Sequence, residues 1–254
     1  MGRVAAAIAA ALVLGGSGAT SAKTLLLIVS GVGGEESYSD SFFEWSSTVI
    51  EAAEEAGVDR QDWVYLAEDP ARSPDKIQGP SRRENVESEL RQLVQRTEQG
   101  DQLWVILFGH GSARNGENRF NLLGPDMTES DFAAILEGTS GRIVFVNASS
   151  ASAGFVAALS SPGRAVITAT RSERERHATT FGGYFAEGLR GSTADLDKDE
   201  QVSLLEAFDY ARLEVGRRYK DEGLLATEHP LLDDNGDGEG SLEPSVSAAD
   251  GALA

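Results

Sequence analysis

The sequence predicts an α/β fold: an open, mostly parallel sheet with helices covering both of its faces. Short and almost wholly apolar runs, which are typical of strands buried on both faces, alternate along the chain with longer amphipathic stretches. Each amphipathic stretch is long enough to form a helical crossover, the connection that parallel neighbours require. The alternation continues from the first apolar run almost to the end of the chain, which favours a single sheet.

The first half of the chain contains three expected strands and two expected helices. An apolar run at 24–30 ends in a glycine-rich turn, and a second run covers 63–66. An irregular, proline-containing loop is expected at 70–80, before an amphipathic helix at 86–94 and a third strand at 103–108. The apolar positions that predict the first helix by their helical spacing are Phe42, Trp45, Val49, Ile50 and Ala53.

The second half continues the same alternation. Thr128 and Asp131 offer a capping arrangement for a short helix, which precedes strands expected at 143–147 and 164–169. Two further helices are indicated by apolar stripes, one made of Phe181, Tyr184, Phe185 and Leu189, the other of Leu204, Phe208, Ala211, Val215 and Tyr219.

The length and the ends of the chain suggest one exported domain. With 254 residues and 41% hydrophobic content, the chain can bury one sizeable core, and we expect a single domain over 23–240. Residues 1–22 have the charged, apolar and small-residue order of a secretory signal, with cleavage expected before Lys23. The sequence thus predicts a secreted or periplasmic protein, free of the membrane after cleavage. The small, polar and acidic residues at 241–254 predict a disordered tail.

Charge and composition exclude several classes of partner and chemistry. The net charge of −19 argues against nucleic acid and anionic membrane surfaces, which would repel the protein. Cations and basic substrates are compatible with this charge, although it would also serve simply to keep an exported protein soluble. The absence of cysteine excludes disulfides, a thiol nucleophile and thiolate metal sites.

Two of the apolar runs end in residues that carry chemistry. One run is followed by His110 and Gly111, and the run that ends at Asn147 is followed by Ser149 and Ser150. Because sites in open parallel sheets form beyond the carboxyl ends of the strands, we expect an imidazole and a hydroxyl to meet at one edge of the sheet. A polar turn, in which serine side chains bond to the local backbone, would explain the serines without any site.

The pattern resembles that of the caspase-like peptidases, and most closely the legumain-type group. In that family one apolar strand leads into His-Gly and a second leads into the catalytic cysteine. The likeness extends from the first strand to about Tyr219, and it implies a caspase-like fold with a peptidase-like cleft. An ungapped alignment puts Ser149 at the position of the family's thiol, whereas a shift of one residue would choose Ser150.

The resemblance also implies roles for these residues. His110 would be the base, Ser149 a weakened nucleophile, and the backbone N–H groups of Gly111 and Ser149 an oxyanion hole. A hydroxyl is far less acidic than a thiol, so a site shaped for a cysteine and histidine dyad should lose most of its rate when sulfur is replaced by oxygen.

An acidic segment at 195–206 has the twelve-residue spacing of an EF-hand calcium loop. Position six is Glu200, where the sharp left-handed turn of such loops favours glycine. Ser203 and Glu206 also fit a helix capping box, which explains both residues without a metal. The ligands expected for calcium are Asp195, Asp197, Asp199, Gln201 through its backbone carbonyl, and Glu206.

A second acidic segment, 233–238, resembles only the first half of such a loop, because Pro244 stands where the final carboxylate should be. The sequence therefore favours a solvated acidic turn at this place. His177 and His229 are interpreted as ordinary polar residues.

Three functions agree with these observations. The favoured one is an exported caspase-like or legumain-like peptidase homologue that has lost its thiol and binds a peptide or protein without cleaving it. The second is an active serine hydrolase that uses Ser149 and His110. The third is a calcium-dependent structural or adhesion module.

Overall fold

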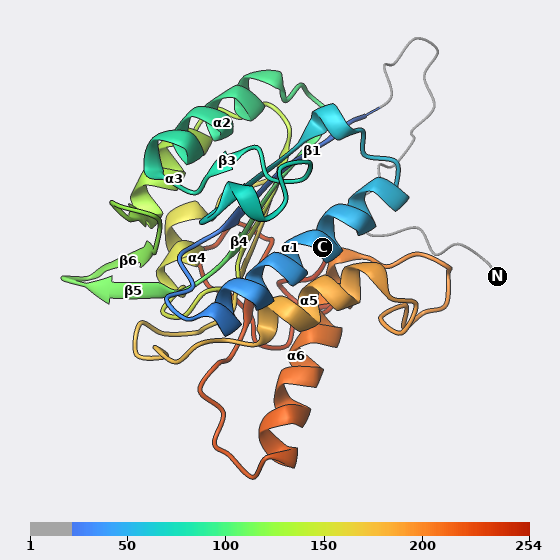
Figure 1. The fold of residues 1–254 in the computed structure, drawn as a ribbon. Helices are drawn as coiled ribbons and strands as arrows, with labels where there is room; N and C mark the ends of the chain where they lie inside the picture. Colours follow the sequence, from blue (N-terminus) through green and yellow to red (C-terminus); the bar gives the residue numbers. More distant parts are fainter. Residues whose placement is uncertain (1–21) are drawn as a thin grey trace, which may run out of the picture.

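The computed structural model describes residues 22–254, so the expected secretory signal lies outside the described residues except for Ala22. Seven strands form the central sheet in the order β10-β9-β8-β4-β1-β2-β3 (Figure 1). Their bounds are β1 Thr24–Ser30, β2 Trp63–Ala67, β3 Gly79–Pro80, β4 Gln102–Phe108, β8 Arg142–Asn147, β9 Arg164–Thr168 and β10 Leu231–Asp233.

All neighbouring strands of this sheet are parallel except β10, which pairs antiparallel with β9. The predicted fold class, an open and mostly parallel sheet with helices on both faces, is therefore confirmed. The sequence gives little sign of β10, because its three residues are too short to show a strand pattern. At the other edge, β3 ends in Pro80, a residue that edge strands tolerate because one side of the strand needs no ladder bond.

Helices cover both faces of the sheet (Figure 1). One face is covered by α1 Glu36–Glu55, α5 Phe181–Arg190 and α6 Leu204–Asp221. The other face is covered by α2 Arg83–Arg96, α3 Glu129–Leu136 and α4 Gly154–Leu159. Short 3-10 turns at Arg60–Asp62 and Pro70–Arg72 flank β2. Among the described residues, no helix is both long enough and apolar enough to cross a membrane.

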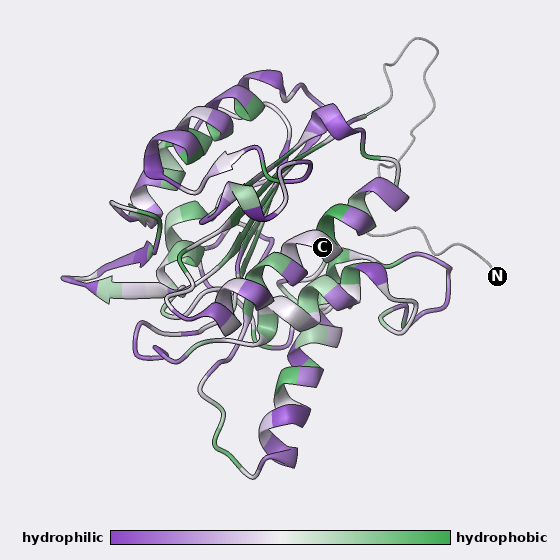
Figure 2. Ribbon diagram, viewed as in Figure 1, coloured by the Kyte–Doolittle hydropathy of each residue, from purple (hydrophilic) through white to green (hydrophobic). Residues whose placement is uncertain are grey.

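The strands supply apolar side chains to both cores, as their continuous hydrophobic character requires. Strand β4 divides its residues by alternation, with Trp104, Ile106 and Phe108 in the core beneath α1, α5 and α6, and Leu103, Val105 and Leu107 in the core beneath α2, α3 and α4. Figure 2 shows the hydrophobic colour concentrated in the central strands and on the inner sides of the helices.

A small antiparallel sheet extends from the carboxyl end of the main sheet (Figure 1). It consists of β5 Gly111–Arg114, β6 Glu117–Phe120 and β7 Met127–Thr128. The hairpin between β5 and β6 turns at Asn115 and Gly116, both with positive φ, 57° and 81°. Asn-Gly is the preferred dipeptide of such two-residue turns, so the sequence carries a signal for this hairpin that the search for apolar runs misses.

Candidate functional site

The ends of β4 and β8 lie side by side, as the sequence predicts. The two strands are parallel neighbours, with Leu107 opposite Asn147. Beyond this point the Gly111 N–H donates to Ser150 Oγ at 3.2 Å, and Ser150 Oγ donates to the Gly111 carbonyl at 3.1 Å. A methyl group placed on Gly111 would lie 2.6 Å from Ser149 Oγ. The structure thus brings Gly111 together with both candidate nucleophiles.

His110 is half-buried at the end of β4 and is held by a loop that the sequence did not implicate. Its Nε2 lies 3.1 Å from the Gly33 carbonyl oxygen, which can only accept, so the imidazole carries its proton on Nε2 and leaves Nδ1 unprotonated in the neutral ring. The rings of Tyr38 and Phe42 pack edge-on against it at centroid distances of 4.7 and 5.4 Å. These contacts fix the plane and the tautomer of the imidazole.

Ser149, in contrast, is sealed within its own turn. It is 0% exposed, and its hydroxyl donates to Asn147 Oδ1 at 2.6 Å and to the Ser150 carbonyl at 3.3 Å. The Ser149 N–H donates to the same Asn147 oxygen at 3.0 Å. Within residues 22–254 no hydrogen bond joins His110 to Ser149 or Ser150. The arrangement is the local polar turn that serine and asparagine favour, and it places no free hydroxyl in a cleft.

The expected oxyanion donors are occupied in the same way. The Gly111 N–H points at Ser150 Oγ, and the Ser149 N–H points at Asn147 Oδ1. Stabilisation of an oxyanion requires donors aimed at the position where the charge develops. As folded, these two N–H groups are directed at protein atoms.

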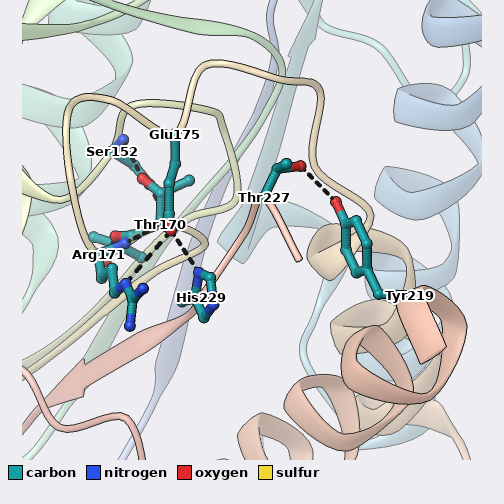
Figure 3. Close-up of polar contacts among 8 residues, drawn as sticks. Ser152, Thr170, Arg171, Glu175, Tyr219, Thr227 and His229 are labelled. Carbon is teal, nitrogen blue, oxygen red and sulfur yellow. Dashed lines mark hydrogen bonds and ion pairs between the residues drawn. The ribbon is translucent and has the colours of Figure 1, made fainter. Parts of the chain in front are cut away.

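The loop that follows β9 supplies Glu175, which forms a pair with His229 that sequence reasoning missed (Figure 3). Glu175 accepts from His229 Nδ1 at 2.5 Å and from the Arg171 N–H at 2.9 Å. The Glu175 carbonyl accepts the N–H of Ala151, whose φ is +48°. His229 therefore ties the strand β10 side of the molecule to the loop above β8. A single histidine far along the chain gives no sequence signal for such a partner.

Below this pair, Ser152 and Thr170 join the ends of β8 and β9. The Ser152 N–H donates to Thr170 Oγ1 at 2.7 Å, and the two hydroxyl oxygens lie 3.0 Å apart (Figure 3). Both residues are fully buried. The turn from Asn147 to Ser152 is thus hydrogen-bonded on both sides, which makes it a rigid part of the sheet edge.

The first acidic segment adopts the bends of a calcium loop. The N–H of Glu200 donates to Asp195 Oδ2, and the N–H of Gln201 donates to Asp199 Oδ1. Glu200 has the left-handed φ of +67° that this position requires. One carboxylate oxygen from each of Asp195, Asp197 and Asp199 lies within 4.8 Å of the others, a separation that one cation would bridge.

The last expected ligand of this segment, Glu206, is engaged elsewhere. It completes the predicted capping box with Ser203, and its other oxygen accepts the N–H groups of Leu196 and Asp197 at 2.8 and 3.3 Å. Burial raises the pKa of Glu206, but these hydrogen bonds outweigh burial and bring the pKa below its ordinary value. Glu206 therefore holds the loop against α6.

The second acidic segment is not the solvated turn that the sequence favours. Asp233 and Asp234 are each 1% exposed. Asp233 accepts the N–H groups of Gly236 and Gly238, whereas Asp234 accepts those of Gly251, Leu253 and Ala254 at 2.6–2.9 Å. The tail expected to be disordered is thus fastened to a buried carboxylate. Composition alone could not reveal this anchor, because it lies outside the tail.

The chain is similar to known proteins in its fold but not in its sequence. No family model matches the chain, and no curated protein matches it in sequence. Among solved structures, protein GSU0716 from Geobacter sulfurreducens is similar at 12% identity and a TM-score of 0.50, over 83% of this chain and 92% of that chain. The caspase drICE is similar at 7% identity and a TM-score of 0.48, over 84% of this chain and 87% of that chain.

Proposed function

We propose that the protein is a caspase-like peptidase homologue that binds a peptide or protein segment at the carboxyl edge of its sheet and does not cleave it. The order of the strands, the His-Gly segment after β4 and the serine segment after β8 support descent from a legumain-like peptidase in which serine has replaced cysteine. Beside the strand ends, the partly buried ring of Tyr38 packs against His110 and supplies an aromatic group of the kind that binds peptides.

The observation that carries the proposal is the state of the Ser149 hydroxyl. A serine nucleophile must lend its proton to a base and reach the substrate carbonyl, but Ser149 is 0% exposed and donates to Asn147 Oδ1 at 2.6 Å. An amide oxygen is too weak a base to activate a hydroxyl. His110, the base expected from the sequence, donates to the Gly33 carbonyl and makes no hydrogen bond to the serine.

Labelling with a fluorophosphonate probe tests the proposal against the active serine hydrolase. We expect no covalent labelling of the folded protein and no hydrolysis of a fluorogenic peptide library, while a labelled peptide still binds in an anisotropy titration. Labelling that disappears in both Ser149→Ala and His110→Ala would instead establish a working serine hydrolase. Labelling that persists in both variants would mark a reaction elsewhere and would leave this proposal standing.

Export is a separate part of the proposal. The order of charged, apolar and small residues at 1–22 supports cleavage before Lys23 and delivery to the periplasm or the exterior. Intact mass measurement of the protein from the secreting cell should give a chain that starts at Lys23. A chain that retains Met1 would contradict it.

We also propose a calcium ion in the loop 195–206, because one observation there goes beyond the spacing of the acids. Asp195 Oδ1 is shielded from solvent and has no hydrogen-bond partner in the described part of the chain, and a buried carboxylate oxygen without a partner is costly. Asp197 and Asp199 add further negative charge within 4.8 Å. A cation bound by these three carboxylates and the Gln201 carbonyl would relieve both defects, which supports a calcium-dependent structural role for this loop.

A further inference from the structure

A cavity of about 340 Å³ opens beyond the carboxyl ends of β1 and β2, on the side of His110 away from the serines. Its floor contains the buried hydroxyl of Tyr65, which lies 3.0 Å from Ser30 Oγ, so the floor is already satisfied by internal hydrogen bonds. Besides small residues and Arg72, the wall has aromatic and acidic residues. They include Phe42, Phe43, Glu36, Glu68 and Asp69.

The charge of the cavity is negative. Three carboxylates line it against a single guanidinium, that of Arg72. Glu68 uses Oε2 to accept the Gly33 N–H at 3.1 Å and the Ser39 hydroxyl at 3.2 Å, and its Oε1 has no hydrogen-bond partner among residues 22–254. Asp69 likewise uses only Oδ1, which accepts the Ala71 N–H. Carboxylates with unpartnered oxygens thus line a space large enough for a long side chain.

The cavity fits an organic cation better than a metal ion. A divalent cation needs carboxylate oxygens that converge, and in the described part of the chain the only such group of carboxylates is the one in the loop 195–206. The acids of the cavity are spread around aromatic walls. A guanidinium or an alkylammonium on a flexible stem would use both features, because its charge meets the carboxylates and its stem or plane lies on the rings.

The protein itself shows that this wall accepts a guanidinium. Arg72 lies over the Phe43 ring with its guanidinium carbon 4.3 Å from the centroid, and it forms an ion pair with Asp40 at 2.7 Å. A second ring and a second carboxylate, those of Phe42 and Glu68, also line the cavity.

The cavity is joined to the candidate cleft. Phe42 lines the cavity, and its ring also packs against the imidazole of His110. Glu68 accepts a hydrogen bond from the Gly33 N–H, and the Gly33 carbonyl accepts one from His110 Nε2. A peptide that passes His110 along the edge of the sheet can therefore insert one side chain between Phe42 and Glu68.

We propose that this cavity binds the side chain of an arginine or a lysine, so that the ligand of the cleft is a peptide segment with a basic residue. The inference rests on the proposed peptide-binding function and names the class of its ligand. The net charge of −19 of the whole chain assists by attracting basic segments at long range.

A matched pair of peptides tests the inference. The probes are fluorescent, capped heptapeptides of alanine and serine with one central arginine, or with citrulline, which has nearly the same shape and no charge. We expect the arginine peptide to bind about tenfold more tightly, a difference of about 1.4 kcal/mol, with a smaller ratio at high salt. A lysine and acetyl-lysine pair should show the same order.

Variants locate the effect in the cavity. Glu36→Gln and Asp69→Asn, alone and combined, remove charge from the walls without touching the contacts of His110, and the combination should lower the ratio of arginine to citrulline affinity severalfold while Glu68 keeps its charge. Glu44→Gln is the matched control, because Glu44 is exposed on the same helix as Glu36 and is outside the cavity. Equal loss in the control would show a general charge effect and would overturn the inference.

Failure of the inference and failure of the proposed function give different results. Tight but equal binding of the arginine and citrulline peptides would overturn the inference and keep the peptide-binding function. In a separate arm, butylguanidinium is titrated against butylurea by nuclear magnetic resonance. Shifts at Phe42 and Phe43 with butylguanidinium alone, when no peptide binds, would support a guanidinium site and overturn the proposed function. No shift with either compound and no peptide preference would overturn the inference.

Discussion

The two acidic loops of this protein share a sequence pattern and differ in how the carboxylates are used. In the loop 233–238 the first carboxylate, Asp233, is buried and both of its oxygens accept backbone N–H groups. In the loop 195–206 the first carboxylate, Asp195, has a shielded oxygen without a partner among residues 22–254, and two further carboxylates lie beside it. The same spacing of acids therefore puts a carboxylate that binds backbone N–H groups in one loop and leaves unbalanced negative charge in the other.

The largest expected effect comes from removing Asp234, the carboxylate next to Asp233 that anchors the tail 241–254. Asp234→Ala would leave the N–H groups of Gly251, Leu253 and Ala254 without their acceptor, and we expect a loss of about 3 kcal/mol in the free energy of unfolding. Denaturant unfolding measures the loss, and limited proteolysis should then cut within 241–254. Asp237→Ala is the control on an exposed acid, with an expected loss under about 1 kcal/mol. Equal effects of the two changes would remove the distinction between anchor and surface acid.

The next effect should come from calcium. An ion that binds only the folded chain stabilises it by RT ln(1 + [L]/Kd), about 2.7 kcal/mol at a hundredfold excess over Kd. Thermal unfolding in millimolar calcium and in chelator should differ for the wild type and for Asp237→Asn, and should coincide for Asp197→Asn. If Asp237→Asn abolishes the shift and Asp197→Asn keeps it, the ion belongs to the second loop and the comparison is reversed.

Substitutions at position six of the two loops should change the stability of the fold in opposite directions. Glu200 has a φ of +67° and Gly238 a φ of +80°, a region that glycine adopts without strain. Glu200→Gly should stabilise the fold by about 1 kcal/mol, and Gly238→Ala should destabilise it by about 1 kcal/mol or slightly more. Chemical denaturation measures both. Destabilisation by Glu200→Gly would mean that the Glu200 side chain contributes more than its backbone strain costs.

The smallest effect is a difference in pH dependence. Burial raises the pKa of Glu206, but hydrogen bonds from Ser203, Leu196 and Asp197 outweigh burial and bring the pKa below its ordinary value. The unfolded chain therefore takes up protons first, and stability falls on acidification. Burial raises the pKa of Asp250, which contacts the second loop, above its ordinary value. The folded chain therefore takes up the proton first, and stability rises on acidification.

The measurement is the unfolding free energy of the wild type minus that of Glu206→Gln or Asp250→Asn, between pH 6 and pH 3. The first difference should shrink as the pH falls, and the second should grow in favour of the wild type. The difference for Glu206 should stay under about 1 kcal/mol, because a partly exposed charge is screened by solvent. Parallel slopes for the two variants would contradict the contrast between the loops.

The sequence was sufficient for the framework of the molecule and for the meeting of its strand ends. Continuous apolar runs specify buried parallel strands, and parallel strands bring their carboxyl ends to one edge, so the contact of Gly111 with Ser150 follows from the register of β4 and β8. The predicted capping boxes at Thr128 and Ser203 are also present, because capping depends only on residues three apart.

Contacts between distant segments could not be predicted in this way. The Gly33 carbonyl accepts a hydrogen bond from His110, which is 77 residues away in the sequence, and Glu175 pairs with His229, which is 54 residues away. Neither acceptor has a local pattern, since any carbonyl or carboxylate can accept a hydrogen bond. The capture of Ser149 by Asn147 is local, but it competes with the catalytic arrangement for the same atoms, and sequence spacing does not say which of the two wins.

The close approach of Gly111 to the serine turn has a consequence for any thiol placed at position 149. A side-chain carbon on Gly111 would lie 2.1 Å from the Ser150 carbonyl oxygen and 2.6 Å from Ser149 Oγ, so the turn has settled into the space next to the backbone. Sulfur is larger than oxygen, and a thiol at position 149 would have to push this turn outward. Ser149→Cys alone should therefore yield no peptidase. The proposed replacement of a cysteine by Ser149 would therefore be difficult to reverse by a single mutation, because the surrounding turn would have to move as well.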